Sequence, residues 1–250
     1  MKKLRLEEII NLVDDNSIVA DIGTDHGIVP YELIKSNKAK KVIASDISEK
    51  SLDKLREKLD YLDEPEKIIL NVSDGLDDLN EYQVDTIIIS GMGGNLIADI
   101  LGKNIDVAKS ANCLILGANN SLSLLRKFLH DNSFEIIEEV DLFENDKYYQ
   151  ILKIKVGKQL FLNEYEYEFG KFLIDNKSEN LKQYIKQQID NKKTILSNIS
   201  EKESDNVKNA IDNINLEIQE LEKVLIKIEA YRFYKLVWKI SSIRTSRRLW

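Results

Sequence analysis

The chain has 250 residues, of which 43% are hydrophobic and 32% charged, and its formal net charge is -7 at pH 7. This length allows the core of one doubly wound domain and leaves roughly 90 residues for an appendage. No apolar run reaches the ~18 residues of a membrane-spanning helix and no secretory leader is present, so we expect a cytoplasmic protein that does not engage a membrane. The single cysteine, Cys113 in the run CLILG, excludes an internal disulfide and is expected to be buried.

The charge is unevenly distributed along the chain. Residues 1–150 carry 17 basic and 29 acidic side chains, and residues 151–250 carry 19 and 14. The acidic excess therefore lies in the first part, and the last hundred residues sum to +5. Such asymmetry suits a protein in which one segment meets a polyanion, although a solvated helix face has a similar composition.

Short runs rich in Val and Ile alternate with segments of helical length in the first part of the chain. They cover residues 17–23, 41–46, 67–71, 84–91 and 113–117. This alternation indicates a mainly parallel sheet that is covered on both faces. Two further runs, 135–143 and 148–156, are so close together that they must form an antiparallel hairpin. Five parallel strands closed by an antiparallel pair are typical of a Rossmann-like class I methyltransferase domain, whereas a nicotinamide-binding domain would end in a sixth parallel strand.

The first strand runs into the turn ADIGTDHGIVP (20–30), which carries Asp21, Gly23 and Gly27 as D-x-G-x-x-x-G. A dinucleotide fingerprint, G-x-G-x-x-G, has a glycine where this turn has Asp25, so the turn is not built for close approach to a pyrophosphate. A cationic ligand without phosphates fits better. S-adenosylmethionine is the expected cofactor, because its sulfonium and ammonium groups favour nearby carboxylates.

Acidic residues also follow the second and third strands. Asp46, with Ile47 beside it, ends the second strand where a carboxylate can accept both ribose hydroxyls, the alternative being a cap of the next helix. Asp74 and Gly75 follow the third strand, where they either hold the adenine ring or form a plain Asp-Gly turn. Because the carboxyl ends of parallel strands meet at one edge, Asp21, Asp46 and Asp74 should converge on a single cofactor site.

The fourth strand ends in ISGMGGNLI (89–97), a turn of nearly bare backbone. Enzymes of this architecture that methylate exocyclic amines carry an Asn-Pro-Pro-Tyr-like turn here, so that chemistry is disfavoured. A flat ring could lie against the glycines; the alternative is a tight turn into a helix that starts near Asn95. The residues expected at the cofactor are Ser90 and Gly91, and those expected at the substrate are Met92, Gly93 and Gly94.

The last part of the chain is predicted to be helical, since all ten glycines and both prolines lie at or before Gly170. A looser apolar stripe from Leu181 to Ile199 precedes a strict heptad, and we expect an antiparallel coiled-coil hairpin; the alternative is two helices packed flat on the sheet domain. The heptad consists of Val207, Ile211, Ile214, Ile218, Leu221, Leu225 and Ile228.

Three domains are expected: a methyltransferase domain at 1–158, a coiled coil at 159–230 and a basic aromatic tail at 231–250. The tail has six basic and no acidic side chains, interleaved with five aromatic ones. Such a composition suits RNA, although a continuation of the helix is an equally good interpretation.

Several of these segments together resemble the bacterial tRNA (adenine(22)-N1)-methyltransferase family. The resemblance runs from about Leu6 to Val156 and rests on ADIGTDHGIVP, NVSDGL, VDTIIISGMGG followed by LIADIL, and LLRKFLHDNSFEIIEEVDLFENDKYYQIL. It implies a class I methyltransferase domain with a C-terminal coiled coil, which uses S-adenosylmethionine to form 1-methyladenosine in tRNA. In one departure, relatives read Gln-Pro-Asn where this chain has Gly117, Ala118 and Asn119, so only Asn119 matches.

The chemistry implied by this resemblance needs positioning more than proton removal. N1 of adenine has a free lone pair at neutral pH, but it lies on the pairing edge, so the base must leave its helix. We expect Asp25, His26 and Asn119 to be the catalytic residues: Asp25 and His26 overhang the sulfonium, and Asn119 contacts the base. The alternative for Asp25 and His26 is that they only brace the loop. No metal is expected.

Binding of tRNA to an acidic domain must rely on local basic surface, for which Lys2, Lys3, Arg5 and the coiled-coil lysines are the candidates. A monomer is expected, and His130 is expected to act as a partner of its helix dipole. Two rival functions stay open: methylation of a small molecule or protein with the same cofactor, and a non-catalytic adaptor whose coiled coil carries the function.

Overall fold

The computed structural model describes residues 4–160, 163–199 and 205–245, and for residues 205 and 230–245 it describes the backbone alone. The chain divides into two compact units, Met1–Glu168 and Phe169–Trp250. The boundary expected between residues 158 and 159 lies ahead of α7 (Glu164–Phe169), most of which belongs to the first unit. The separate roles of the expected domains remain predictions.

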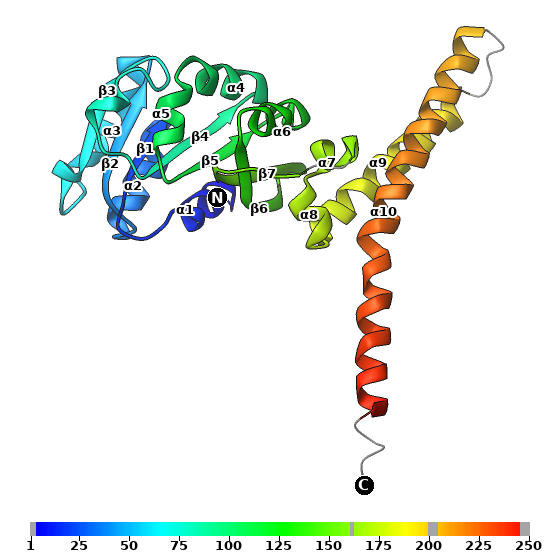
Figure 1. Ribbon diagram of the computed structural model, residues 1–250. Coiled ribbons are helices and arrows are strands. Elements are labelled where there is room, and N and C mark those ends of the chain that lie inside the picture. The colour runs from blue at the N-terminus through cyan, green and yellow to red at the C-terminus, as the bar shows by residue number, and fades with distance from the viewer. Residues whose placement is uncertain (1–3, 161–162, 200–204, 246–250) are drawn as a thin grey trace. The chain divides into compact units, whose positions relative to one another are not determined.

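The first unit is built on a seven-stranded sheet with the order β3-β2-β1-β4-β5-β7-β6 (Figure 1). Strands β1 to β5 pair in parallel, whereas β7 runs antiparallel to β5 and β6 antiparallel to β7. The expected class I methyltransferase sheet is thereby confirmed. The strands are β1 (Ser17–Ile22), β2 (Ala39–Asp46), β3 (Ile68–Val72), β4 (Thr86–Met92), β5 (Cys113–Ala118), β6 (Phe134–Glu144) and β7 (Lys147–Val156).

Helices cover both faces of this sheet, because successive strand residues point to opposite faces and both sets are apolar. In β1, Val19 packs in the cluster that includes α1, α2 and α3, and Ala20 packs in the cluster that includes α4, α5 and α6. Cys113 is buried in β5, as expected. These helices are α1 (Leu4–Leu12), α2 (Ile28–Lys35), α3 (Glu49–Leu59), α4 (Gly94–Lys103), α5 (Ile105–Ser110) and α6 (Leu122–Asp131).

A buried charged network ties the end of the first unit to its sheet. Arg126 of α6 is fully buried and donates to the side chains of Glu139 in β6 and Gln150 in β7. Its other terminal nitrogen donates to the backbone carbonyls of Tyr167 and Glu168, at 2.8 and 3.1 Å. The planar fork of arginine suits such simultaneous contacts, so one side chain connects two strands and α7.

Replacing Arg126 by methionine should lower the free energy of unfolding by roughly 3–5 kcal/mol, because Glu139 would stay buried without this cation. Urea denaturation of the full chain measures the loss. The matched control is Arg56→Met, since Arg56 is half exposed and pairs with Asp53 on α3, and exposed pairs contribute little. Equal stability of the two variants would contradict the assigned role of Arg126.

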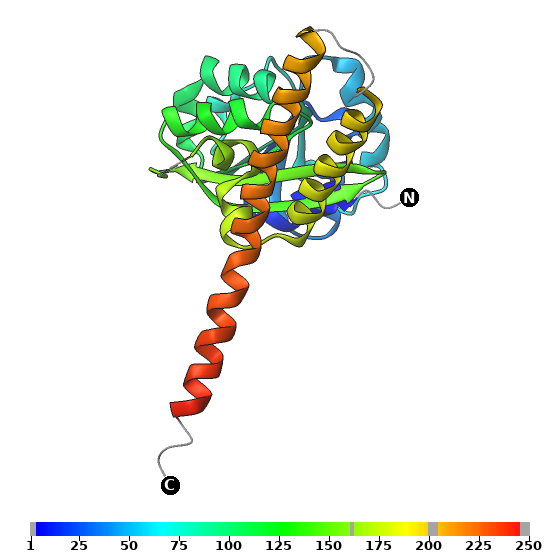
Figure 2. The ribbon, with the colours of Figure 1, turned by 90° about the vertical axis from the view of Figure 1, so that its right-hand side faces the viewer.

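The second unit is helical. Its elements are α8 (Lys171–Asp175), α9 (Glu179–Ile199) and α10 (Asp205–Thr245). Helices α9 and α10 pack side by side and antiparallel (Figure 2). Four lysines of α9 form ion pairs across this hairpin: Lys182 and Lys186 with Glu229, Lys192 with Glu217, and Lys193 with Glu222. The expected helical hairpin is thereby confirmed.

Of the seven heptad residues of α10, three are buried, whereas Val207, Ile211, Ile214 and Leu225 are half-buried. Val224 is 2% exposed, whereas Leu225, the expected seam residue, is only half-buried. Helix α8 packs on α10 as well, so the apolar face of α10 is wider than a two-helix seam requires. The other buried positions are Leu181, Ile185 and Ile189 of α9 and Ile218, Leu221 and Ile228 of α10.

The tail expected at 231–250 continues α10 as far as Thr245, and its side chains lie outside the described residues. Within the described ranges, no helix combines the length and the apolar composition needed to cross a membrane.

Candidate active site

Two adjoining cavities lie at the carboxyl edge of the sheet. The first, of about 360 Å³, is lined by Arg5, Leu6, Asp21, Gly23, Thr24, Asp25, His26, Ile28, Val29, Asp46, Ser90, Gly91 and Met92. The second, of about 230 Å³, is lined by Ile22, Gly23, Asp46, Ile47, Ser73, Asp74, Gly75, Met92, Leu96 and Ile100. Gly23, Asp46 and Met92 line both cavities, so the structure brings the ends of β1, β2, β3 and β4 to one rim.

Asp21, near the end of β1, is buried at the first cavity, with 5% of its surface exposed. Burial raises the pKa of its carboxyl group to about 6; Thr24 opposes this rise and Asp46 adds to it. An ionised carboxylate in such a place is stabilised by a cation. This wall of the cavity therefore favours a positively charged ligand.

Asp46 ends β2 and lines both cavities. Its Oδ1 accepts a hydrogen bond from the backbone N–H of Ser48 at 2.8 Å. Ser48 is the N-cap residue of α3 but makes no side-chain capping bond. Asp46 thus shapes the turn into α3 and also lines both cavities. Ile47 beside it is 72% exposed and lines the second cavity.

The two glycines of the β1–α2 turn differ in what they permit. At Gly23, φ is +72°, a backbone conformation that favours glycine, and a Cβ atom would lie 2.1 Å from Cε of Met92, so a side chain there would be strained and would displace the end of Met92. At Gly27, φ is +58° and a Cβ atom would lie 2.5 Å from Cβ of Leu55 on α3. Gly27 lines neither cavity, and its place in the fold is a close helix contact.

Asp25 and His26 form the short 3-10 turn η1 (Asp25–Gly27) at the first cavity. Nε2 of His26 lies 3.4 Å from Oδ2 of Asp25, and His26 has a φ of +62°. Helix α3 supports this turn: Lys58 Nζ donates to the His26 carbonyl at 2.6 Å, and Lys54 Nζ lies 3.8 Å from Asp25 Oδ1. Both side chains of the turn stay substantially exposed, so they can reach a ligand at the cavity mouth.

Asp74 lines the second cavity, but its carboxylate is already engaged. Lys103 of α4 donates to Asp74 at 2.9 Å and to Asp77 at 2.8 Å. The hydrogen bonds that Lys103 donates to Asp77 and Asp74 raise the pKa of Lys103 to about 12. Gly75 has a φ of +62°, and a Cβ atom there would lie 3.1 Å from Ile100. Asp74 and Gly75 therefore form an Asp-Gly turn that also lines the second cavity.

Fewer residues of the glycine-rich segment at the end of β4 line the two cavities than the sequence suggests. Ser90, Gly91 and Met92 line the first cavity, and a Cβ atom on Gly91 would meet nothing within 4 Å. At Gly93, by contrast, a Cβ atom would lie 2.9 Å from Asn120 Oδ1, and at Gly94 it would lie 2.5 Å from the Ser121 carbonyl. Gly93 and Gly94 thus allow close packing against the loop after β5, and neither lines a cavity.

Asn119, at the end of β5, bridges two residues that line the first cavity. Its Nδ2 donates to the Gly91 carbonyl at 2.7 Å, and its Oδ1 accepts from Arg5 at 2.8 Å. Arg5 was assigned above to surface contacts with tRNA, yet the structure places it in the cavity wall. A Cβ atom on Gly117 would lie 3.1 Å from Cβ of Ser90, so a larger residue there would press on β4.

Some lining residues carry no sequence signal that marks them. Leu6, Thr24, Ile28 and Val29 at the first cavity and Ser73, Leu96 and Ile100 at the second are apolar or small and look like ordinary core or loop residues.

His130 lies elsewhere: its Nδ1 is 2.5 Å from the Tyr167 hydroxyl. In the described part of the chain, no group of three or more His, Cys, Asp and Glu side chains is arranged to hold a metal.

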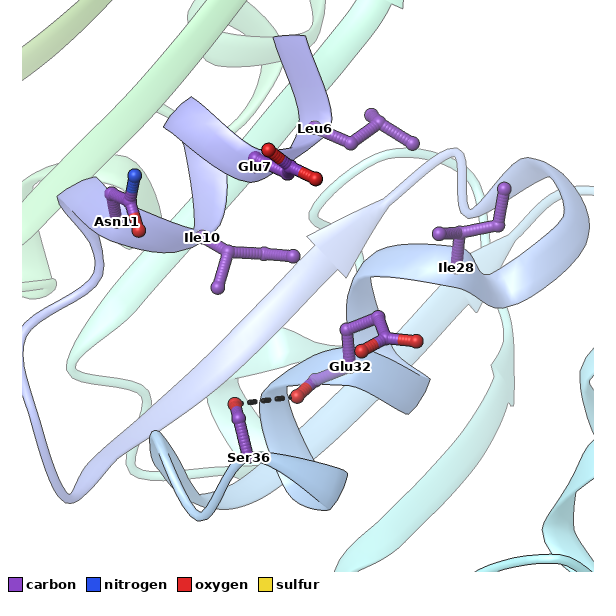
Figure 3. A pocket seen from close by; sticks show the side chains of 7 residues that line it. All are labelled: Leu6, Glu7, Ile10, Asn11, Ile28, Glu32 and Ser36. Carbon is purple, nitrogen blue, oxygen red and sulfur yellow. Dashed lines mark hydrogen bonds between the residues drawn. The ribbon is translucent and has the colours of Figure 1, made fainter. Parts of the chain in front are cut away.

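A larger cavity, of about 520 Å³, lies between α1 and α2 (Figure 3). It is lined by Leu6, Glu7, Ile10, Asn11, Ile28, Glu32 and Ser36. Ser36 Oγ donates to the Glu32 carbonyl at 2.6 Å within it. Because none of the expected site residues reaches this cavity, its size does not make it the reactive site.

The residues at the rim fit S-adenosylmethionine. Asp21 and Asp46 offer carboxylates to a cation and to hydroxyl groups, and Gly23 leaves room where a side chain would clash. The Ser73 hydroxyl at the second cavity is buried and has no hydrogen-bond partner among the described residues. Buried polar atoms are normally paired, so this hydroxyl suits a polar ligand.

The chain is similar to known methyltransferases. The family described as "Methyltransferase domain" matches residues 2–152. The tRNA (adenine(22)-N(1))-methyltransferase of Bacillus subtilis is 30% identical over 153 residues, which span 61% of this chain and 64% of that protein. The structure of Streptococcus pneumoniae Sp1610 in complex with S-adenosyl-L-methionine is 30% identical, with a TM-score of 0.78 over 90% of this chain and 100% of that chain. The structure of M. capricolum TrmK in complex with S-adenosyl-homocysteine is 27% identical, with a TM-score of 0.76 over 91% of this chain and 99% of that chain.

The sheet, the rim of carboxylates and the matched domain define a class I methyltransferase. The chain belongs to the tRNA (adenine(22)-N1)-methyltransferase family.

Proposed function

We propose that this protein transfers the methyl group of S-adenosylmethionine to N1 of adenine 22 in tRNA and so forms 1-methyladenosine. The observation that carries the proposal is the shared rim: Asp21 and Asp46 face one cavity, Asp46 and Asp74 face the next, and the first cavity opens beside the bare backbone of Gly91. The related proteins named above act on that nucleotide or bind that cofactor.

The chain's own residues would hold the cofactor along this rim. When bound, S-adenosylmethionine would supply an electrophilic methyl group, and the electron pair of the broken carbon–sulfur bond would stay on the sulfur of the departing S-adenosylhomocysteine. Asp46 would accept the ribose hydroxyls, and Asp21 would face the cationic end. Asp74 is held by Lys103, so we propose that one of its oxygens accepts the adenine amino group while the other stays with Lys103.

The target base would enter the first cavity near Gly91 and Asn119. The N1 lone pair attacks directly, so the protein must align N1 about 3–3.5 Å from the methyl carbon. The ring becomes cationic as the bond forms. Asp25 and His26 lie at the mouth of this cavity, where a carboxylate or imidazole can stabilise that charge through hydrogen bonds.

Replacing Asp25 or His26 by alanine should lower kcat by about 10- to 100-fold, within the range for positioned polar groups. The dissociation constant of S-adenosylmethionine should change much less. His130→Ala is the matched control, because His130 is the other histidine and lines neither cavity. Turnover that stays unchanged in both variants would remove Asp25 and His26 from the mechanism and leave them as braces of the loop.

Several of the basic residues expected to bind tRNA are engaged within the protein. Four of the coiled-coil lysines are in ion pairs with glutamates, and Arg5 bonds to Asn119. Lys2 and Lys3 lie outside the described residues. We propose that the tail at 231–250 supplies phosphate contacts, because its six basic side chains have no acidic neighbours within it. We propose that the protein acts in the cytoplasm and as a monomer; the formation of both cavities by one chain supports the monomer.

The rival functions predict different binding. An acceptor other than tRNA predicts no saturable complex with tRNA at moderate salt, whereas the proposed function predicts one whose affinity falls steeply as salt rises. A non-catalytic adaptor predicts no heat of S-adenosylmethionine binding in calorimetry. Cofactor binding without any tRNA complex would favour the small-molecule or protein acceptor.

A further inference from the structure

We infer that Arg5 is a positioning residue that fixes the side-chain amide of Asn119 with its oxygen available to the target base. The fixed oxygen then selects adenine through the hydrogen of the 6-amino group. This inference rests on the proposed function and adds to it the way in which the base is recognised.

Arg5 is itself held at several points. It lies in the first turn of α1, where its backbone N–H donates to Oε1 of Glu144 at 3.2 Å. Its guanidinium lies over the ring of Tyr149, with 4.7 Å between Cζ and the ring centroid. Such a stack is favourable and restricts the rotation of the side chain. The β6–β7 hairpin therefore fixes where the guanidinium meets Asn119.

The contacts of Asn119 leave one orientation for its amide. Oδ1 accepts from Arg5 at 2.8 Å and Nδ2 donates to the Gly91 carbonyl at 2.7 Å, while the backbone N–H donates to the Met92 carbonyl at 2.8 Å. A flipped amide would set its NH2 group against a guanidinium that only donates and its oxygen against a carbonyl that only accepts. Both bonds would be lost, so Arg5 and Gly91 together determine the orientation.

This orientation gives the rim a hydrogen-bond acceptor. Arg5 and Gly91 both line the first cavity, and Asn119 between them is exposed. A carbonyl oxygen has two lone pairs, so Oδ1 can accept a second bond while it stays with Arg5. In adenine the 6-amino group lies beside N1 and donates, whereas guanine and hypoxanthine present an oxygen there. An acceptor at this place matches adenine and repels the other two.

The hydrogen bond from the 6-amino group of adenine to Oδ1 of Asn119 would strengthen during the reaction. The electron pair of N1 would form the new bond to the methyl carbon as the carbon–sulfur bond breaks and its electron pair stays on sulfur, and the product ring would carry the positive charge. That charge makes the 6-amino hydrogens better donors, so a fixed acceptor stabilises the transition state more than the bound base. Sites built to bond a substrate N–H reject analogues that lack it by large factors.

The test compares two tRNAs that differ only at the target nucleotide, which is adenine in one and unsubstituted purine in the other. Both bases have the N1 lone pair, but purine has no 6-amino group. For the unaltered protein, kcat/KM should be about 10- to 100-fold lower with purine. In Arg5→Met the value for adenine should fall and the value for purine should stay, so that the ratio shrinks to within about threefold.

Further variants keep the inference falsifiable if Arg5→Met folds poorly. Asn119→Ala removes the acceptor, leaves α1 unaltered and should show the same small ratio. Arg5→Lys keeps a donor to Oδ1 and should restore part of the preference, while Arg56→Met on α3 should leave the ratio unchanged. Retained affinity for S-adenosylmethionine checks the fold.

The outcomes separate two kinds of failure. An equal fall with both tRNAs in Arg5→Met and in Asn119→Ala would overturn the inference and make the contact merely structural. Equal rates on adenine and purine with the unaltered protein would also overturn it. If the unaltered protein methylates neither tRNA, the proposed function itself fails.

Discussion

Replacing Asp21 by asparagine should weaken S-adenosylmethionine binding by about 10- to 100-fold at pH 8, and titration calorimetry measures the loss. A hydrogen bond or contact to a charged group contributes about 1.5–3 kcal/mol, and each 1.4 kcal/mol is a factor of ten in affinity. Asp21 is buried at the first cavity, so solvent would not replace its charge. Asp53→Asn on the exposed face of α3 is the control and should bind normally.

The pH dependence of binding follows from the pKa of about 6 for Asp21 in the ligand-free protein. A cationic ligand needs the ionised carboxylate, which is fully formed above about pH 7. Below pH 6 the ligand must displace a proton, so the apparent dissociation constant should rise about tenfold by pH 5. In Asp21→Asn this part of the profile should be flat. Parallel profiles for the two proteins would contradict the role of Asp21.

The raised pKa also provides a control for folding. A carboxyl group whose pKa is higher in the folded than in the unfolded state destabilises the fold where it is ionised in both, which is above about pH 6 for Asp21. That destabilisation disappears as the pH falls through 6 toward the unfolded value of 3.8. Asp21→Asn should therefore be at least as stable as the unaltered protein at pH 8 without ligand. Weak binding in a stable variant separates ligand contact from folding.

A chain that ends at Glu168 should lose tRNA affinity by about 100-fold or more and should bind S-adenosylmethionine normally. The cut follows the boundary between the compact units and keeps the carbonyls that Arg126 holds. The first part of the chain is acidic, so without the C-terminal unit few phosphate contacts would remain. Filter binding at several salt concentrations measures both the affinity and its salt slope.

A second truncation, at residue 230, distinguishes the hairpin from the tail. The proposed tail contacts predict that this chain also loses most of its affinity and has a smaller salt slope. Affinity that survives at 230 but not at 168 would assign tRNA binding to the hairpin. Full binding by the chain that ends at 168 would make the whole C-terminal unit structural.

The fold was largely predictable because its signals are local. The β-branched runs predicted the strands, the short connection at Glu144–Lys147 predicted the hairpin of β6 and β7, and the heptad predicted α10. The heptad pattern did not predict that Val224 is more buried than Leu225, and it did not predict that helix α8 also packs on α10.

The site was predictable where a residue ends a strand. Asp21, Asp46 and Asp74 were placed at one edge by the parallel topology alone. The partners of these residues depend on distant contacts: Arg5 and Asn119 are 114 positions apart, and Lys103 reaches Asp74 from α4. The glycine-rich composition also suggested that the backbone at Gly93 and Gly94 is open to a ligand. In the structure, Asn120 and Ser121 occupy the space beside these two glycines.

The most direct measurement is incubation of the full chain with labelled S-adenosylmethionine and unmodified tRNA, followed by nucleoside mass analysis. Label is expected in 1-methyladenosine, at no more than one site per tRNA, and mass analysis of ribonuclease fragments should locate it at nucleotide 22. Label on the 6-amino group, label in another nucleoside, or no transfer to tRNA by a protein that binds the cofactor would contradict the proposed function.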